Sequence, residues 1–265
     1  MQKVFEELTT AFRKHGGVLN EVQYHDIVTK HTTLLEDPQT ILLLLQASGY
    51  PIEEISSNTY RLQTYFTPFQ VQRFCVIDIE TNGSKPGTSQ VIEIGAVMIQ
   101  NAEVIDRFET FVECAFLPEY ITKITGIEPM DLVGAPTRRE ALTALKHFMG
   151  DAVFVAHNAN FDYTFLSASF DRFGLGQIGN PKLCTIDLAK RTFESERYGL
   201  AYLIDALEIE TATHHRAYSD AVSAARVMEK SFETLPSYVK TTDELLRFSL
   251  SSQKERRIHK EQQEG

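Results

Sequence analysis

The run Phe74–Thr81 constrains the fold of this chain more than any other segment. It reads Phe-Cys-Val-Ile-Asp-Ile-Glu-Thr, and its short, apolar, β-branched composition predicts a strand. Side chains alternate between the two faces of a strand, so Asp78 and Glu80 point the same way. Two carboxylates on one face of an otherwise apolar strand are costly to bury unless they are neutralised. A divalent metal ion is the usual neutralising group, although a lone Asp-x-Glu is also typical of a strand with one polar face.

The overall composition is that of a globular protein with one domain and a small appendage. The chain has 265 residues, of which 43% are hydrophobic and 10% aromatic, within the usual range for such proteins. The apolar run 41–45 falls far short of the roughly 18–20 residues of a membrane span, so we expect no membrane segment. The polar, acidic N-terminus is unlike a signal peptide, and three widely spaced cysteines fit reduced thiols. We therefore expect a cytoplasmic protein without disulfides.

The net charge of −10 bears on the partners that this chain can bind. A protein that depends on non-specific phosphate contacts is normally basic. If this chain handles nucleic acid, we expect the attraction to be local or to come from bound metal ions. Affinity for long substrates should then be modest unless a partner protein delivers them.

Residues 1–70 predict a small, mainly helical module. Helical patterns cover 4–12, 22–28 and 40–47, and a turn with a short alternating strand covers 57–62. Several short helices closed by a small β element have the outline of a winged-helix-like module. Its 5 basic against 8 acidic residues favour a protein partner, such as a polymerase or another replication protein, over duplex DNA.

Residues 71–235 predict a mixed sheet flanked by helices. Three strands at 73–81, 91–100 and 107–115 follow one another, and their short links imply antiparallel neighbours. A fourth strand at 152–156 then begins an alternation of strands and helices. Three antiparallel strands followed by such an alternation place helices on the faces of one mixed sheet, an α/β fold.

The two ends of this region are marked by changes in composition. Thr67-Pro68-Phe69 predicts a boundary after the N-terminal module, because the residue before proline avoids the helical conformation. Residues 236–265 end in a run of charged and polar side chains. We expect them to form a polar tail, either a frayed helix or a disordered segment.

Two further carboxylates and one histidine occupy positions that suit the ends of helices. Asp162 follows an apolar strand and lies in the first turn of the next predicted helix, and Asp220 opens the last helix. Either aspartate could simply stabilise a helix N-terminus. His215 lies five residues before Asp220. A loop histidine is commonly a surface residue, but one tethered this close to a potential metal ligand is well placed to act as a base.

Together these positions resemble the DEDDh branch of the 3′–5′ exonucleases. This ribonuclease H-like group includes the epsilon proofreading subunit of bacterial replicative DNA polymerase. The resemblance covers residues 72–232 and implies a ribonuclease H-like mixed sheet, but it says nothing about the first 70 residues. It is carried by three ordered motifs and one connecting segment, namely Asp78–Gly83, His157–Asp162, His215–Ala221 and the stretch from Ile124 to Pro136.

The resemblance implies metal-dependent hydrolysis of a terminal phosphodiester with release of a nucleoside 5′-monophosphate. Two divalent cations can clamp the attacking and leaving oxygens of such a reaction. Mg²⁺ and Mn²⁺ prefer oxygen ligands, and His215 is implied as the general base. The implied ligands are the four carboxylates, with Asp78 as the bridge between the ions: Asp78, Glu80, Asp162 and Asp220.

Four more residues are expected to contact the terminal nucleotide of a substrate. Thr81 and Gly83 lie in the loop after the acidic pair, where backbone donors and a hydroxyl are available. His157 and Phe161 flank Asp162 and are expected on the opposite side of that nucleotide. For each of these residues, ordinary loop or core packing is the alternative.

The expected partner is a nucleic acid with a 3′ end, with DNA favoured over RNA. An exoribonuclease of the ribonuclease T or oligoribonuclease kind remains an alternative, although the extra N-terminal module disfavours the oligoribonuclease. A non-catalytic nucleic-acid or polymerase-binding module is a further alternative. Such modules usually lose metal ligands, whereas this chain keeps all the reactive positions.

Overall fold

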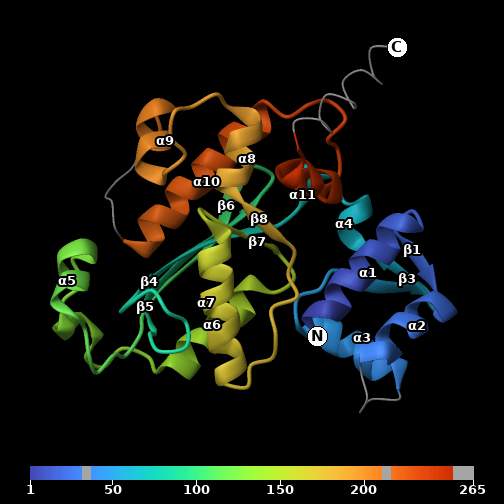
Figure 1. The fold of residues 1–265 in the computed structure, drawn as a ribbon, viewed down its shortest axis with the longest axis horizontal. Coiled ribbons are helices and arrows are strands. Elements are labelled where there is room, and N and C mark those ends of the chain that lie inside the picture. The colour runs from blue at the N-terminus through green and yellow to red at the C-terminus, as the bar shows by residue number, and fades with distance from the viewer. Residues whose placement is uncertain (32–36, 211–215, 253–265) are drawn as a thin grey trace.

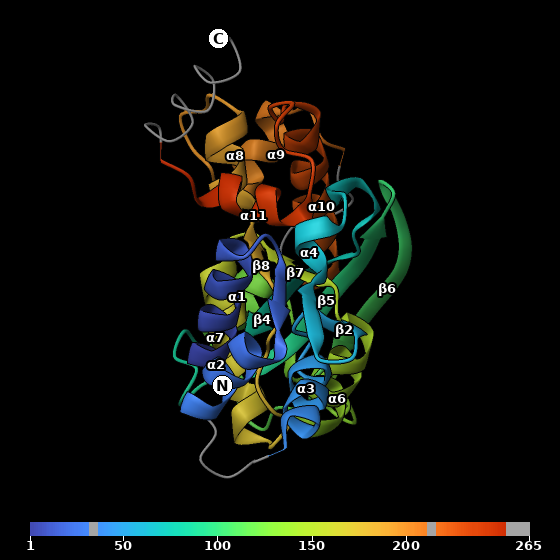
Figure 2. The same cartoon turned by 90° about the vertical axis from the view of Figure 1, so that its right-hand side faces the viewer.

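A computed structural model describes residues 1–31, 37–210 and 216–252. Within them the chain forms a three-stranded antiparallel sheet near its N-terminus and a five-stranded mixed sheet flanked by helices (Figures 1 and 2). The expected α/β fold with a mixed sheet is confirmed. Among the described helices, none is both long enough and apolar enough to cross a membrane.

In its described residues before Gln63, the N-terminal module has three helices and three strands around a core of its own. Strand β3 pairs antiparallel with both β1 and β2, and the rings of Tyr24 and Tyr60 stack at 4.1 Å inside this core. The arrangement agrees with the winged-helix-like outline, although the sequence pattern predicted only the strand at β3 and revealed neither β1 nor β2. The elements in order are α1 (Gln2–Lys14), β1 (Val18–Asn20), α2 (Glu21–His31), α3 (Pro38–Ala47), β2 (Ile52–Ser56) and β3 (Thr59–Leu62).

The five-stranded sheet has the order β6-β5-β4-β7-β8. Its first three strands are antiparallel neighbours, whereas β7 and β8 run parallel to β4 and follow helical crossovers. The module joins this sheet through α4 (Gln63–Phe66) and the short 3-10 helix η1 (Phe69–Val71). The strands are β4 (Phe74–Thr81), β5 (Val91–Gln100), β6 (Glu103–Phe111), β7 (Val153–Ala156) and β8 (Lys182–Cys184).

Strand β6 begins earlier than the expected range 107–115. Asn101 and Ala102 both have positive φ angles, 54° and 60°, which is the conformation of a two-residue hairpin turn that matches strand twist. This turn pairs Gln100 directly with Glu103. The apolar pattern of the sequence had suggested a later start because much of β6 is exposed.

Helices cover both faces of the five-stranded sheet (Figure 1). Alternate side chains of β4 enter different cores: Cys75 and Ile77 pack with α6 and α7, whereas Phe74 and Val76 pack with α10 and α11. The helices are α5 (Glu119–Thr125), η2 (Pro129–Leu132), α6 (Arg138–Met149), α7 (Ala159–Arg172), α8 (Thr185–Thr192), α9 (Leu200–Ala206), α10 (Ala217–Glu233) and α11 (Thr242–Leu250).

The expectation of a polar tail after residue 235 is wrong for the part that forms α11. Thr241 caps this helix with a capping box, and Leu245, Leu246 and Phe248 are buried in the same core as α10. Pro68 forms an isolated bridge with Thr241, so a contact with the distant start of the sheet domain orders the segment. Residues 253–265 lie outside the described part of the chain.

The N-terminal module packs against the sheet domain (Figure 2). Arg13 of α1 forms a salt bridge of 2.8 Å with Asp243 of α11, whose side chain is only 2% exposed. The backbone N–H of Gly179 donates a hydrogen bond of 2.6 Å to the carbonyl oxygen of Ser48. A buried charge and a backbone hydrogen bond thus tie the two parts together.

Candidate active site

The polar end of β4 lies where this strand extends beyond its parallel neighbour. The pairing of β4 with β7 covers Phe74–Val76, whereas β4 itself continues to Thr81. Asp78 and Glu80 lie in this extension, both half-buried. They continue the face that Phe74 and Val76 turn towards α10. The sequence-based expectation that both carboxylates share one face is consistent with this alternation.

Asp220 completes a group of three carboxylates. It lies in the first turn of α10, the helix that packs on β4 and β5. Asp78, Glu80 and Asp220 each offer one carboxylate oxygen, and these oxygens lie within 4.8 Å of one another. The end of β4 and the start of α10, at least 140 positions apart in the sequence, therefore meet at one point.

Asp162 approaches from the other side, in the first turn of α7. Its side chain is 3% exposed, and hydrogen bonds from its own backbone N–H and from that of Ile79 hold the carboxylate. Ile79 lies between Asp78 and Glu80 on β4, so Asp162 is attached to the strand that carries the other two acids.

Burial and mutual repulsion disfavour the ionised form of these carboxylates. Burial is the largest cause of the raised pKa of Asp78, followed by the negative charges of its acidic neighbours, Asp162 first among them. Burial likewise raises the pKa of Glu80 to about 7 and that of Asp162 to about 7. Raised carboxyl pKa values in one cluster are typical of a functional site.

The structure adds two residues that the sequence-based reasoning missed. Glu93 of β5 is 0% exposed and lies opposite Glu80 in the antiparallel ladder. Arg216 precedes α10 and donates to Glu93 Oε1 from Nε at 3.0 Å and from Nη2 at 2.7 Å. An acid within the apolar run Val91–Ile99 was the signal that could have indicated Glu93.

The loop that follows β4 is held by hydrogen bonds of its own. The Thr81 hydroxyl donates to the carbonyl oxygen of Gly83 at 2.9 Å. The Asn82 side chain accepts from the backbone N–H of Gln90 at 2.8 Å and donates to the Phe116 carbonyl oxygen at 3.1 Å. The loop is therefore ordered beside the carboxylates, with the Thr81 hydroxyl engaged within it.

His157 and Phe161 occupy different environments. His157 Nδ1 bonds the Thr185 hydroxyl at 2.8 Å, and Nε2 bonds the carbonyl oxygen of Tyr198 at 3.0 Å. Burial lowers the pKa of His157 to about 4, so the ring is neutral and both nitrogens have protein partners. His157 thus orders the start of α8, which leaves no ring nitrogen for the expected nucleotide contact. Phe161 is 36% exposed on the first turn of α7.

His215 lies outside the described residues. It immediately precedes Arg216 in the chain, whose guanidinium is fixed by Glu93.

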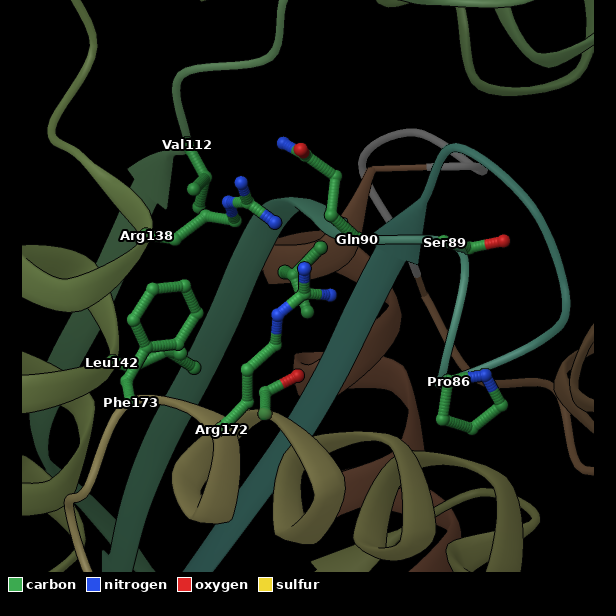
Figure 3. Close-up of a pocket in the computed structure, with 10 residues that line it drawn as sticks. Pro86, Ser89, Gln90, Val112, Arg138, Leu142, Arg172 and Phe173 are labelled. Carbon is green, nitrogen blue, oxygen red and sulfur yellow. The ribbon is translucent and has the colours of Figure 1, made fainter.

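A small pocket on the other face of the sheet is separate from this cluster (Figure 3). Arg138 of α6 and Arg172 of α7 line it, together with Ser89 and Gln90 from the end of the loop before β5 (Figure 3). Its lining contains none of the expected site residues. This pocket does not contribute to the carboxylate site.

The carboxylate cluster suits a hard divalent cation. Its donors are oxygens, the closest of them lie within 4.8 Å of one another, and the buried acids repel one another when they are ionised. A cation between them would supply the missing positive charge.

Comparison with known proteins places the sheet domain in a family. The model of the family RNase_T, described as exonuclease, matches residues 75–228. The PolC-type DNA polymerase III of Caldanaerobacter subterraneus subsp. tengcongensis is 38% identical over 164 residues, which are 61% of this chain and 12% of that protein. The corresponding protein of Staphylococcus aureus is 37% identical over 165 residues, 61% of this chain and 11% of its own length. The chain thus spans about a tenth of these relatives.

Solved structures show the same fold. Exonuclease I of E. coli, in complex with a dT13 oligonucleotide, superposes with a TM-score of 0.55 at 19% identity, over 62% of this chain and 41% of that one. Exonuclease X, in complex with 5′ overhanging duplex DNA, superposes with a TM-score of 0.53 at 21% identity. That match covers 66% of this chain and 99% of Exonuclease X.

Proposed function

The chain belongs to the RNase_T exonuclease family, and from this membership we propose that it is a metal-dependent 3′–5′ exonuclease that releases nucleoside 5′-monophosphates. The observation that carries the proposal is the meeting of Asp78, Glu80 and Asp220 with their oxygens within 4.8 Å. Asp162, buried beside the same strand, completes the carboxylate set. These four residues are the proposed ligands of two divalent cations, Mg²⁺ or Mn²⁺.

The proposed mechanism assigns a task to each side chain. The bound cations would stabilise the negative charge that develops on the scissile phosphate. Asp78 and Glu80 hold their carboxylates on one face of β4, and Asp162 and Asp220 bring theirs from the first turns of two helices. His215 accepts the proton of the attacking water. Its place directly before the anchored Arg216 supports this role.

The proposed substrate is DNA with a free 3′ end, bound against the loop after β4. The backbone around Thr81 and Gly83 supplies contacts on one side of the terminal nucleotide, and the exposed ring of Phe161 supplies a stacking surface on the other. The polymerase relatives and the DNA-bound Exonuclease I and Exonuclease X support DNA as the substrate.

We further propose that residues 1–70 form a domain for a protein partner in replication. The exposed side chains of α3 include Leu43 and Leu44, and this helix carries no charged residue. A helix that binds a DNA groove would normally offer basic side chains to the phosphates. Its apolar surface is better suited to a protein than to duplex DNA.

Labelled oligonucleotides test the proposed activity. With DNA labelled at its 5′ end and Mg²⁺ or Mn²⁺ present, we expect a ladder of progressively shorter labelled products. With label in the 3′-terminal nucleotide, we expect immediate release of labelled mononucleotide, and EDTA should stop both reactions. Mononucleotide released first from the 5′ end would contradict the direction, and preferential degradation of a matched RNA would favour an exoribonuclease.

A further inference from the structure

The first turn of α10, which carries Asp220, is held against the sheet at two residues of β5, Glu93 and Gly95. Glu93 Oε2 accepts a hydrogen bond of 3.1 Å from the backbone N–H of Ala217, the first residue of α10. The same carboxylate holds the Arg216 guanidinium through its other oxygen. A carboxylate at a helix N-terminus is favoured by the unpaired N–H groups there. One buried side chain thus fixes both the approach to α10 and its first residue.

Gly95 allows the helix to come this close. A Cβ atom at Gly95 would lie 2.0 Å from the backbone nitrogen of Tyr218 and 2.2 Å from the carbonyl carbon of Ala217. Gly95 is also the register partner of Asp78 across the ladder. The backbone of α10 therefore rests on β5 at the level of one proposed metal ligand.

Arg216 is held from more than one side. Its guanidinium lies over the ring of Phe111, 5.2 Å from the ring centroid, and Phe111 is the register partner of Glu93 on β6. Glu109 of β6 approaches Arg216 at 3.8 Å, but its side chain is 51% exposed. The buried partner and the aromatic face give Arg216 one fixed orientation, as a planar fork permits.

Arg216 and Asp220 are connected through the first turn of α10. The backbone N–H of Asp220 donates to the Arg216 carbonyl oxygen at 3.0 Å. A shift of Arg216 or Ala217 on the sheet would therefore move the carboxylate of Asp220 relative to Asp78 and Glu80. Sets of metal ligands tolerate little displacement, and the residues that orient them influence affinity strongly.

From these contacts we infer that Glu93 and Arg216 are positioning residues, which set α10 in register on β5 so that Asp220 meets Asp78 and Glu80. The inference rests on the proposed metal-dependent function. Neither side chain is assigned to an ion or to substrate.

The test compares Glu93→Gln, Arg216→Met and the double variant with Glu109→Gln as the matched control. Glu93→Gln loses the hydrogen bond from either Arg216 or the Ala217 N–H, because the glutamine side chain has only one accepting oxygen. Glu109→Gln removes the same charge from an exposed side chain. Each variant is measured for melting temperature, Mn²⁺ affinity by calorimetry, and kcat and KM on a DNA oligonucleotide.

We expect Glu93→Gln to weaken Mn²⁺ binding by about 10–100-fold. The value of kcat should fall at limiting Mn²⁺ and recover partly when more is added, while KM for the oligonucleotide changes by less than about twofold. Glu109→Gln should behave like the wild type. The double variant, which leaves no buried charge unpaired, should be no worse than the poorer single variant.

A purely structural role would give a different result. Glu93→Gln would then lower the melting temperature, but its Mn²⁺ affinity and kcat would stay within about twofold of those of Glu109→Gln. That outcome overturns the inference while leaving the proposed function intact. A wild-type protein that neither binds Mn²⁺ nor hydrolyses DNA overturns the proposed function, and the inference with it.

Discussion

Glu80 of β4 and Glu93 of β5 are partners across the antiparallel ladder, but their carboxylates make different contacts. Glu93 gives both oxygens to Arg216 and Ala217, whereas Glu80 contributes an oxygen to the group with Asp78 and Asp220. After burial itself, the charge of Glu93 is the largest cause of the raised pKa of Glu80, and Arg216 partly offsets it. The Glu93 carboxylate is therefore occupied by protein contacts, whereas the Glu80 carboxylate is available for a cation.

Replacing Asp220 by Ala should reduce hydrolysis at least about 100-fold, because the proposed metal ligand on α10 is lost. The metal-free variant should melt no lower than the wild type, since one of several mutually repelling carboxylates has been removed. Kinetics on a DNA oligonucleotide and thermal melting in EDTA measure the two effects. Asp171→Ala, an exposed aspartate on α7, is the control and should keep full activity. An active Asp220→Ala enzyme would exclude this aspartate from the site.

Stability of the metal-free protein should depend on pH through Glu80. Its pKa is about 7 in the folded state against an ordinary value of 4.5. Between these values the folded chain keeps a proton that the unfolded chain has lost, so this group destabilises the fold as pH rises from about 4.5 to 7. The effect is at most roughly 3.5 kcal/mol, at about 1.4 kcal/mol per pKa unit.

A comparison with Glu80→Gln isolates that contribution. Chemical denaturation in EDTA at pH 5 and pH 8 gives the free energy of unfolding of both proteins. The wild type should lose stability relative to Glu80→Gln as the pH is raised. Parallel pH profiles for the two proteins would show that Glu80 titrates normally.

Gly95→Ala should disturb the site through the backbone. The added Cβ would meet backbone atoms of Ala217 and Tyr218 at 2.0–2.4 Å, which flexible side chains cannot relieve. We expect a loss of at least about 2 kcal/mol in the free energy of unfolding, together with weaker Mn²⁺ binding. At Gly87 a Cβ meets nothing within 4 Å, so Gly87→Ala should leave both properties unchanged. Equal effects of the two substitutions would contradict the close approach of α10 to β5.

Arg13→Met should destabilise the whole chain. It leaves Asp243, 2% exposed, without its cationic partner, and a buried unpaired carboxylate is costly. Because Arg13 itself is 36% exposed, we expect a loss of about 1–3 kcal/mol. Arg73→Met breaks a pair in which both side chains are exposed, with Asp151, and should cost less than about 1 kcal/mol. Denaturant unfolding that shows no difference between these variants would argue against a shared interface.

The parts of the fold and site that could be predicted depend on local pattern. Alternation along β4 was enough to predict that Asp78 and Glu80 share a face, and the strand-to-helix transition was enough to place Asp162 in the first turn of α7. The order of the three motifs indicated that Asp220 joins them. The first two inferences needed only the two-residue period of a strand or one helical turn, whereas the inference about Asp220 rested on the family resemblance.

The parts that could not be predicted depend on distant contacts. Glu93 is part of the site because α10 returns to β5 more than 120 residues later, and α11 is ordered by contacts with the segment around Pro68. His157 carries two protein hydrogen bonds because Thr185 and Tyr198 fold back to it. Local pattern in the sequence contains no signal for such pairings.

Titration of the wild-type protein with Mn²⁺ tests the central claim most directly. We predict binding of two ions per chain and, at about 100 times the dissociation constant, a gain of about 2.7 kcal/mol in stability for each ion. Even one bound ion should then raise the melting temperature by about 5 °C or more. Asp78→Asn should lose both the binding and the thermal shift, with Asp171→Asn as the unaffected control. Absence of binding and of any thermal shift at millimolar Mn²⁺, or an unchanged titration in Asp78→Asn, would contradict the metal site proposed at the end of β4.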